Sequence, residues 1–377
     1  MISCMKKRLA FLPLLLALLA IIVFPNLKTI FGKKSQDNGS ISHWAHISKL
    51  IENTFPQFSF SLSGPITEAS SSSAEATEKV VAHEEKRIFF LAGKPSHRSG
   101  EHEFRAGSIL LANALNEQAD LAIQAEVISG WPQDDSVLNG ASAIVIYCDS
   151  DSLHREHYNR LMELAKAGAG LFFMHYGVHP QKAISGQTYY MPTVGGFMEK
   201  GFSVNPIWAA ELNTPSNHPI RRGCEKPIKA FDEFYYNLRF HEKSFPLLTG
   251  IPTEGSLIRT NLWNKNGENG LNKPQTIMWG FENEKGIRGG GFTGGHYHRN
   301  WAIDDFRKAI LNTIVWIAGF DVPEGGVKSK KVTEEMINAN LDQKKKIFRV
   351  KLPLKSPMEY YRETKKARSG GKKRNKK

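Results

Sequence analysis

The chain lacks most of the features that mark disulfide-stabilised and nucleotide-binding proteins. Three of its 377 residues are cysteines, at positions 4, 148 and 224, and they form neither a Cys-x-x-Cys motif nor a dense framework, which excludes a disulfide scaffold. No Gly-x-Gly-x-x-Gly or phosphate-binding loop is present, so a nucleotide site has no support, and there is no internal repeat. We expect Cys148 and Cys224 to be unpaired thiols; their pairing in an oxidising compartment is the alternative.

Net charge is also missing from most of the chain. The formal net charge is +13, but residues 328–377 hold 18 Lys and Arg against 5 Asp and Glu and so account for all of it. Residues 1–327 are neutral overall, which argues against a body that binds nucleic acid specifically. We expect 328–377 to be a basic, disordered tail. Contact of this tail with anionic lipid or another polyanion is the alternative.

The N-terminus has a basic start followed by an apolar run. Residues 5–8 read Met-Lys-Lys-Arg, and residues 9–24 are apolar up to Pro25. This pattern is typical of a signal peptide or a short membrane anchor, which we place in residues 1–32. Because no clear small-residue cleavage site follows, we favour a retained anchor, with a cleaved peptide as the alternative. Either one leaves the body anchored to the cell membrane or exported, on the periplasmic side, behind a Ser-rich linker over 33–85.

Residues 86–327 alternate between short apolar runs and stretches with helical spacing. The apolar runs predict buried strands over 87–93, 122–129, 143–147, 170–174, 276–280 and 286–292. Helical spacing predicts helices over 101–117, 152–167 and 304–319. Strands that alternate with helices are typical of βαβ units. We therefore expect an α/β fold of three layers, with a parallel sheet and helices on both of its faces.

Histidines and carboxylates follow several predicted strands, at the edge where open α/β sheets bind ligands. They are His97, His102 and Glu103 after the first strand, His175 after the fourth, Glu233 in the middle of the chain, and His296 and His298 after the last. Imidazole suits acid–base catalysis or metal ligation; a loop hydrogen bond is the alternative for His175. Asp232 and Glu233 are adjacent on a predicted extended segment, so we expect only one of them to face the ligand.

Six motifs in order resemble the ThuA-like (trehalose-utilisation) family over about residues 86–327. They are Pro95-Ser96-His97, Gly100-x-His102-Glu103-Phe104, His175-Tyr176-Gly177, Ser203-Val204-Asn205-Pro206, Asp232-Glu233-Phe234-Tyr235-Tyr236 and Gly291-Phe292-Thr293-Gly294-Gly295-His296. The resemblance implies a class I glutamine amidotransferase-like, flavodoxin-like fold. It also implies a link to sugar breakdown, particularly of disaccharides through 3-keto intermediates. Amidotransferases of the wider superfamily carry a nucleophilic cysteine where this chain has His175, so we do not expect glutamine hydrolysis.

These observations predict a sugar-processing enzyme, namely an isomerase, lyase or hydrolase that acts on oxidised glycosides. A non-catalytic carbohydrate-binding or scaffold protein is the alternative. We assign catalytic roles to His175, Glu233 and His97, and substrate contacts to Tyr176, Tyr235 and His298. We assign metal ligation to His102, Glu103 and His296, for a divalent ion such as Zn²⁺, with no cofactor as the alternative. The expected partners are a small carbohydrate and, through the N-terminal segment, the membrane.

Overall fold

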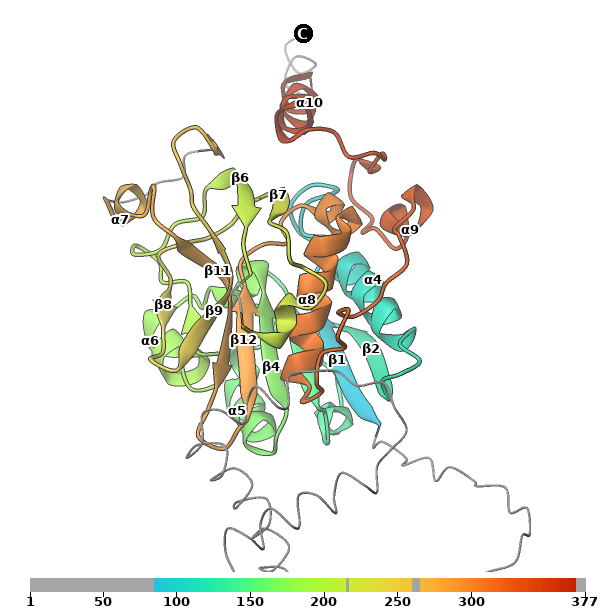
Figure 1. The fold of residues 1–377 in the computed structure, drawn as a ribbon, viewed down its shortest axis with the longest axis vertical. Coiled ribbons are helices and arrows are strands. Elements are labelled where there is room, and N and C mark those ends of the chain that lie inside the picture. Colours follow the sequence, from blue (N-terminus) through green and yellow to red (C-terminus); the bar gives the residue numbers. More distant parts are fainter. Residues whose placement is uncertain (1–84, 215–216, 260–264, 371–377) are drawn as a thin grey trace, which may run out of the picture. The chain divides into compact units, whose positions relative to one another are not determined.

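The structure is a computed structural model that describes residues 85–214, 217–259 and 265–370. Its centre is a seven-stranded sheet in which every strand except β11 runs in the same direction (Figure 1). In spatial order the strands are β2 (Ile123–Ser129), β1 (Lys86–Ala92), β3 (Ala143–Tyr147), β4 (Gly170–Met174), β12 (Arg288–Phe292), β11 (Gln275–Glu282) and β9 (Ser244–Gly250). The first five follow the flavodoxin-like order, which confirms the predicted fold class.

Helices cover both faces of the sheet. Helices α4 (Phe104–Asn116) and α8 (Asp304–Ile317) lie on the near face in Figure 1, and α5 (Tyr158–Lys166) lies on the far face. Alternate strand residues supply the two cores: Ile88 and Phe90 of β1 pack toward α4 and α8, whereas Phe89 and Leu91 pack toward α5. A strand buried on both faces is necessarily a continuous apolar run, which is how the sequence predicts it.

Strand β12 contains three consecutive glycines because its neighbours lie very close. A Cβ atom at Gly289 would lie 2.1 Å from the carbonyl oxygen of Thr193, and one at Gly290 would lie 2.4 Å from that of Trp279. Backbone atoms cannot yield as a flexible side chain does, so a larger residue would force this part of the sheet apart. The loop that carries His296 follows strand β12 directly.

Smaller elements surround the sheet. They are β5 (Gly196–Phe197) paired with β8 (Arg239–Phe240), the sheet β10 (Leu257–Arg259)–β6 (Ile207–Leu212)–β7 (Ile228–Asp232), and the helices α6 (Ala183–Ser185), α7 (Lys265–Asn269), α9 (Glu334–Asn338) and α10 (Pro357–Gly370). None of the helices in the described ranges has the length and hydropathy needed to cross a bilayer. The predicted anchor and most of the predicted linker lie outside the described residues.

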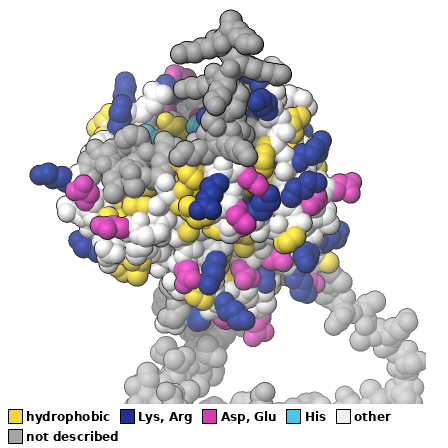
Figure 2. All heavy atoms as spheres, turned by 90° about the horizontal axis from the view of Figure 1, so that it is seen from above, with side chains coloured by type: hydrophobic (Ala, Val, Ile, Leu, Met, Phe, Trp, Pro, Cys, Tyr) yellow, Lys and Arg dark blue, Asp and Glu magenta, His cyan; other side chains and the backbone are white. Residues whose placement is uncertain are grey.

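The prediction of a disordered tail from residue 328 is wrong for the part that the structure describes. Residues 328–363, here called the C-terminal strap, pack against the domain and bury the side chains of Val332, Ile337, Val350 and Tyr360. The charges of the body are mixed in sign: Lys and Arg lie among Asp and Glu on the face shown in Figure 2. The basic composition of the strap therefore does not keep it in solvent, because these four apolar side chains are buried against the domain.

Candidate functional site

The carboxyl ends of β1, β3, β4 and β12 meet at one edge of the sheet and supply one cluster of side chains. His97 and His102 follow β1, Asp149 follows β3, His175 follows β4 and His296 follows β12. The chain leaves β1 toward α4 on one face and leaves β3 toward α5 on the other. Ligands of open α/β sheets bind where the connections diverge in this way.

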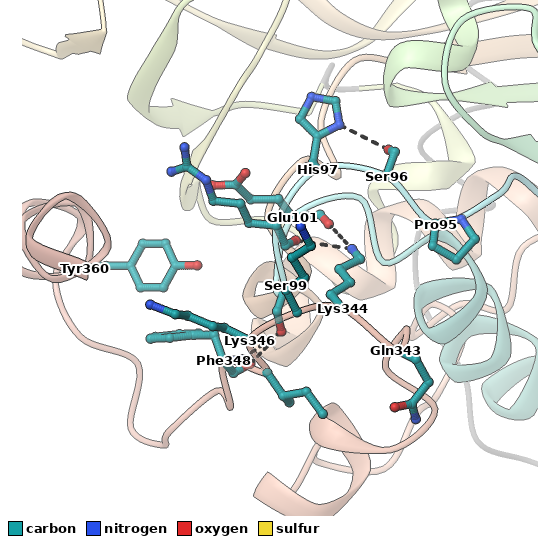
Figure 3. Close-up of a pocket in the computed structure, with 13 residues that line it drawn as sticks. Pro95, Ser96, His97, Ser99, Glu101, Gln343, Lys344, Lys346, Phe348 and Tyr360 are labelled. Carbon is teal, nitrogen blue, oxygen red and sulfur yellow. Dashed lines mark hydrogen bonds between the residues drawn. The ribbon is translucent and has the colours of Figure 1, made fainter. Parts of the chain in front are cut away.

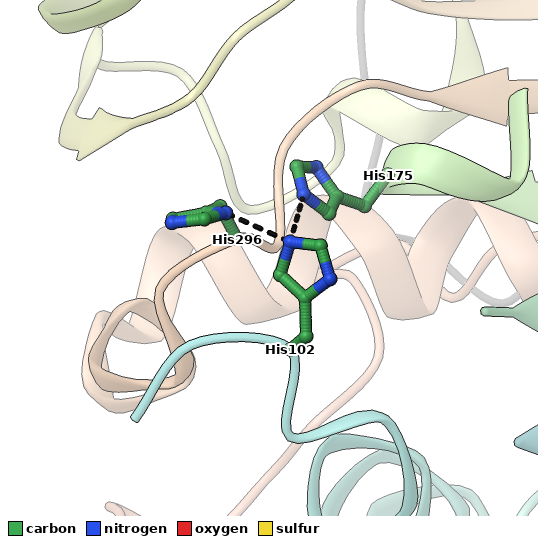
Figure 4. Close-up of side chains that lie close together, drawn as sticks. All are labelled: His102, His175 and His296. Atoms are coloured by element: carbon green, nitrogen blue, oxygen red, sulfur yellow. Dashed lines mark hydrogen bonds between the residues drawn. The ribbon is translucent and has the colours of Figure 1, made fainter. Parts of the chain in front are cut away.

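Three imidazoles converge at this edge, on His102, His175 and His296 (Figure 4). His102 Nε2 lies 2.9 Å from His296 Nδ1 and 3.1 Å from His175 Nε2. Ligand nitrogens around a tetrahedral zinc ion lie roughly 3.3 Å apart. The three side chains are almost completely buried. The cluster is therefore a buried histidine triad whose spacing suits a metal ion.

The outer nitrogens of two of these rings already have acceptors. His102 Nδ1 lies 2.7 Å from Asp149 Oδ1, and His175 Nδ1 lies 2.9 Å from the carbonyl oxygen of Thr293. A carboxylate and a carbonyl only accept, so each Nδ1 carries the hydrogen in the neutral ring. The two Nε2 atoms then face each other with lone pairs, an arrangement that a shared cation satisfies. An acceptor on the remote nitrogen is also the usual surrounding of a metal-bound histidine.

Burial keeps the imidazole rings of His102 and His175 neutral. It lowers the pKa of His175 to about 4, and it lowers the pKa of His102 much further because the neighbouring His175 and His97 also oppose a positive charge there. Metals bind the neutral imidazole, so a lowered pKa leaves the ligand available at neutral pH.

The backbone at the site is held in an unusual conformation. His97, His102 and His175 have φ values of 57°, 49° and 52°, in the left-handed region that residues other than glycine seldom adopt. Each such residue costs of order 1–3 kcal/mol and persists where the surroundings enforce it, typically at functional sites. His97 and His102 lie in the segment between β1 and α4, and His175 directly follows β4.

Two carboxylates of β7 and its continuation serve different purposes. Glu233 Oε2 lies 3.7 Å from His296 Nδ1 and 3.9 Å from His175 Nε2, so it faces the triad. Asp232 is fully buried and accepts hydrogen bonds from the backbone N–H groups of Gly295 and Tyr297, on either side of His296. Burial raises the pKa of Asp232 to about 6, against the effect of these donors. The expectation that only one of the two acids faces the site is confirmed.

A cavity of about 1040 Å³ lies beside the triad and is lined by two of its residues, His102 and His296, with His175 buried behind them. Among the residues that line it are His97, His102, Glu233, His296, Tyr176, Tyr235, His179, Lys200 and Asn205. Tyr235 packs its ring 5.2 Å from that of His175. His97 lies at the rim: its side chain is 43% exposed, and its ring stacks on that of His102 at 3.6 Å. It also lies near Asp149, with which it and His102 form a second, more exposed group of potential ligands.

The structure places two predicted site residues elsewhere. Glu103 is fully buried, and its carboxylate accepts from the backbone N–H groups of Gly100 and Asp342 and pairs with Lys344. His298 Nε2 binds the carbonyl oxygen of Ile337, in the strap. The proposed metal role of Glu103 and substrate role of His298 are therefore corrected, because both side chains turn from the cavity toward the C-terminal strap.

Sequence reasoning missed three polar residues of the site. Asp149 ends the strand pattern of β3, a position that already pointed to the ligand edge. His179 belongs to the same segment as His175, lines the cavity, and has neither ring nitrogen hydrogen-bonded within the described structure. Glu101, at the start of the predicted helix over 101–117, approaches His296 Nε2 at 4.0 Å. The location of Asp149 just after a predicted strand is the signal that could have identified it. Nothing in the sequence distinguishes Glu101 from a residue that caps a helix.

Comparisons with known proteins give similarity of fold. No family model matches the chain, and no curated protein matches it. A protein named as ThuA-like from Parabacteroides merdae is 14% identical, with 67% of this chain and 94% of that chain covered and a TM-score of 0.44. Another named as ThuA-like, from Bacteroides uniformis, is 12% identical, with 66% and 95% covered and a TM-score of 0.46. A glutamine amidotransferase from Thermotoga maritima is 8% identical, with 56% and 76% covered and a TM-score of 0.32. The fold class given above rests on the strand order.

Proposed function

We propose that this protein is a metal-dependent enzyme of carbohydrate breakdown that acts on an oxidised sugar. The observation that carries the proposal is the meeting of His102 Nε2, His175 Nε2 and His296 Nδ1 around one point, with hydrogen-bond acceptors behind the first two rings. The resemblance of the motifs to the ThuA-like family supports the substrate class. A glycoside that carries a ketone, such as a 3-keto-disaccharide, is the substrate that we propose.

The donor set fits a divalent ion such as Zn²⁺, because three neutral imidazoles with a nearby carboxylate are common zinc ligands. A cation bound by the triad would polarise the carbonyl of the sugar and lower the barrier to removing a proton beside it. Glu233 lies within 4 Å of two triad nitrogens, so its carboxylate is near any group that the triad holds. Tyr176 and Tyr235 line the same cavity, and aromatic rings stack well on the apolar faces of sugars.

In this proposal Glu233 is the general base. Its carboxylate takes the proton from the carbon next to the ketone, and the electron pair of the broken C–H bond forms the double bond of the enolate. Return of that proton to the former carbonyl carbon, together with transfer of the proton of the adjacent hydroxyl group to the former carbonyl oxygen, gives isomerisation. In elimination the enolate re-forms the ketone, and its carbon–carbon electron pair forms a double bond to the carbon that bears the glycosidic oxygen. That oxygen leaves with the electron pair of the broken C–O bond and takes up the proton. The two outcomes share their first step, and this step is the one to test.

The test uses the purified full-length chain. We expect about one equivalent of zinc per chain after metal loading and dialysis, and loss of that metal in His102→Ala. His157→Ala, a change outside the cluster, should retain it. In D2O, the wild-type protein should exchange the proton beside the ketone of a 3-keto-disaccharide for deuterium, as seen by NMR. Glu233→Gln should keep the metal and lose the exchange.

Two results would overturn the proposal. A wild-type protein that holds no metal after loading would show that the triad provides no Lewis acid for the proposed reaction. Metal-loaded protein that binds the keto-sugar tightly, but exchanges no faster than Glu233→Gln, would indicate a carbohydrate-binding protein instead.

A further inference from the structure

A second cavity, of about 860 Å³, lies beside the histidine cluster (Figure 3). One wall is the loop after β1, residues 95–99 together with Glu101, and the other is residues 343–348 of the C-terminal strap with Tyr360 of α10. Three residues, His97, Arg98 and Glu101, line both this cavity and the one at the triad. The two cavities are therefore adjacent, and one elongated molecule can occupy both.

The wall formed by the strap is fixed to the loop that carries His102. Lys344 Nζ donates to the carbonyl oxygens of Arg98 and Glu101 at 3.2 Å and 2.6 Å, and it pairs with Glu103 at 3.1 Å. Ser99 Oγ accepts from the backbone N–H of Phe348 at 2.7 Å. The backbone of residues 344–348 is consequently anchored at both ends of the cavity wall, and the side chains between these anchors start from defined positions.

The cavity is positively charged. Lys344 is neutralised by Glu103 and Asp342, but Lys345, Lys346 and Arg98 have no carboxylate oxygen within 4.0 Å among the described residues. Glu101 is the acid in the lining, and it approaches His296. Phe348 and Tyr360 add aromatic rings 5.8 Å apart at the same wall, near Lys346 in Figure 3.

We infer that this second cavity binds an anionic group carried by the substrate. The three unneutralised cations would hold a carboxylate, sulfate or phosphate oxyanion, because guanidinium and ammonium groups form strong charge-assisted hydrogen bonds with such oxygens. The aromatic wall would contact the ring that bears the anion. The proposed enzyme would then favour acidic oligosaccharides, with the reacting sugar at the triad and the acidic unit between Arg98 and Lys346. This inference rests on the proposed function for the identity of the reacting sugar.

The experiment compares four disaccharides on the full-length, zinc-loaded protein by calorimetry: a neutral one and its uronate, 6-sulfate and 6-phosphate forms. We expect at least one acidic form to bind about tenfold more tightly than the neutral form. Raising the salt from about 0.05 M to about 0.5 M should shrink this preference. The double variant Lys345→Ala/Lys346→Ala should lose the preference while binding the neutral sugar as the wild type does. The acid that gains most identifies the oxyanion.

The matched control is Lys166→Ala/Lys285→Ala, which removes the same charge from exposed positions outside both cavities. It should retain the preference, which separates the cavity from the net charge. Equal binding of all four sugars to the wild type would overturn the inference, as would a preference that survives in Lys345→Ala/Lys346→Ala. Zinc content and deuterium exchange on the neutral keto-sugar are measured in parallel. A failure of the proposed function appears in those two readouts and leaves the binding comparison intact.

Discussion

Replacing Glu103 by glutamine tests whether this residue holds the strap rather than a metal. In the structure its carboxylate, fully buried, receives the N–H groups of Gly100 and Asp342 at 2.8 Å each and the ammonium of Lys344 at 3.1 Å. The amide of Glu103→Gln has one accepting oxygen, so at least one of these donors loses its partner. Lys344 would keep its hydrogen bonds to backbone carbonyl oxygens, but Asp342, 3.6 Å away, would be the carboxylate left beside it.

Breaking a buried ion pair on one side costs about 3–5 kcal/mol. Since Asp342 remains beside Lys344, we expect the lower end, a loss of about 3 kcal/mol in the free energy of unfolding. Urea unfolding followed by tryptophan fluorescence measures it. The double variant Glu103→Gln/Lys344→Met removes both charges. Its loss of unfolding free energy should be about 1–3 kcal/mol smaller than the sum of the losses in the two single variants.

Zinc binding distinguishes the two roles of Glu103. We expect Glu103→Gln to bind the same amount of zinc as the wild type, because its carboxylate faces the strap. A variant of undiminished stability that has lost its metal would refute this reasoning and restore Glu103 as a ligand. A loss of unfolding free energy in the double variant that equals the sum of the two single losses would show that the interaction of Glu103 with Lys344 does not stabilise the fold.

Three further predictions follow from individual contacts. Asp149→Asn weakens the acceptor behind His102 and should lower zinc affinity about 10–100-fold in a competition titration. Unchanged affinity would show that Asp149 does not support zinc binding at the triad. Gly289→Ala should destabilise the protein by about 1–3 kcal/mol because its Cβ meets the Thr193 carbonyl. The control, Gly255→Ala, lies at a position with open space around it and should change stability by less than about 0.5 kcal/mol. Burial lowers the pKa of His154 to about 3, so its contribution to stability is complete above the unfolded pKa of 6.5 and is lost as the pH falls toward 3. His154→Gln should therefore reduce the slope of unfolding free energy against pH by about 1.4 kcal/mol per unit between pH 4 and 6; an unaltered slope would contradict a neutral His154.

The strand ends could be predicted from the sequence because they depend on local patterns. Apolar runs such as 143–147 and 170–174 are buried on both faces, and their observed bounds coincide with the runs themselves. Once the strands are parallel, the loops that follow them begin at the same edge of the sheet. The sequence alone therefore indicates that His102, His175 and His296 lie near one another, although 194 residues separate the first from the last.

The direction of individual side chains could not be predicted in this way. Glu103 directly follows His102, yet one turns to the strap and the other to the triad. The backbone at His102 has a φ of 49°, and the Gly100 N–H draws the Glu103 carboxylate back along the chain. Adjacent residues in an irregular loop have no fixed period, so their sides are set by such contacts.

The strap shows why composition misjudged the C-terminal region. Its buried apolar residues, Val332, Ile337, Val350 and Tyr360, are spaced at intervals that match neither a helix nor a strand, so no periodic signal reveals them. The Glu103 carboxylate that receives the strap lies more than 200 residues earlier in the chain. A basic segment becomes an ordered one when the body presents a buried acid to a lysine, as Glu103 does to Lys344. Lys345 and Lys346, next to this contact, line the second cavity and form no ion pair within the part of the chain that the structure describes, so the charge that suggested a solvated tail lies where we propose that an anionic group binds.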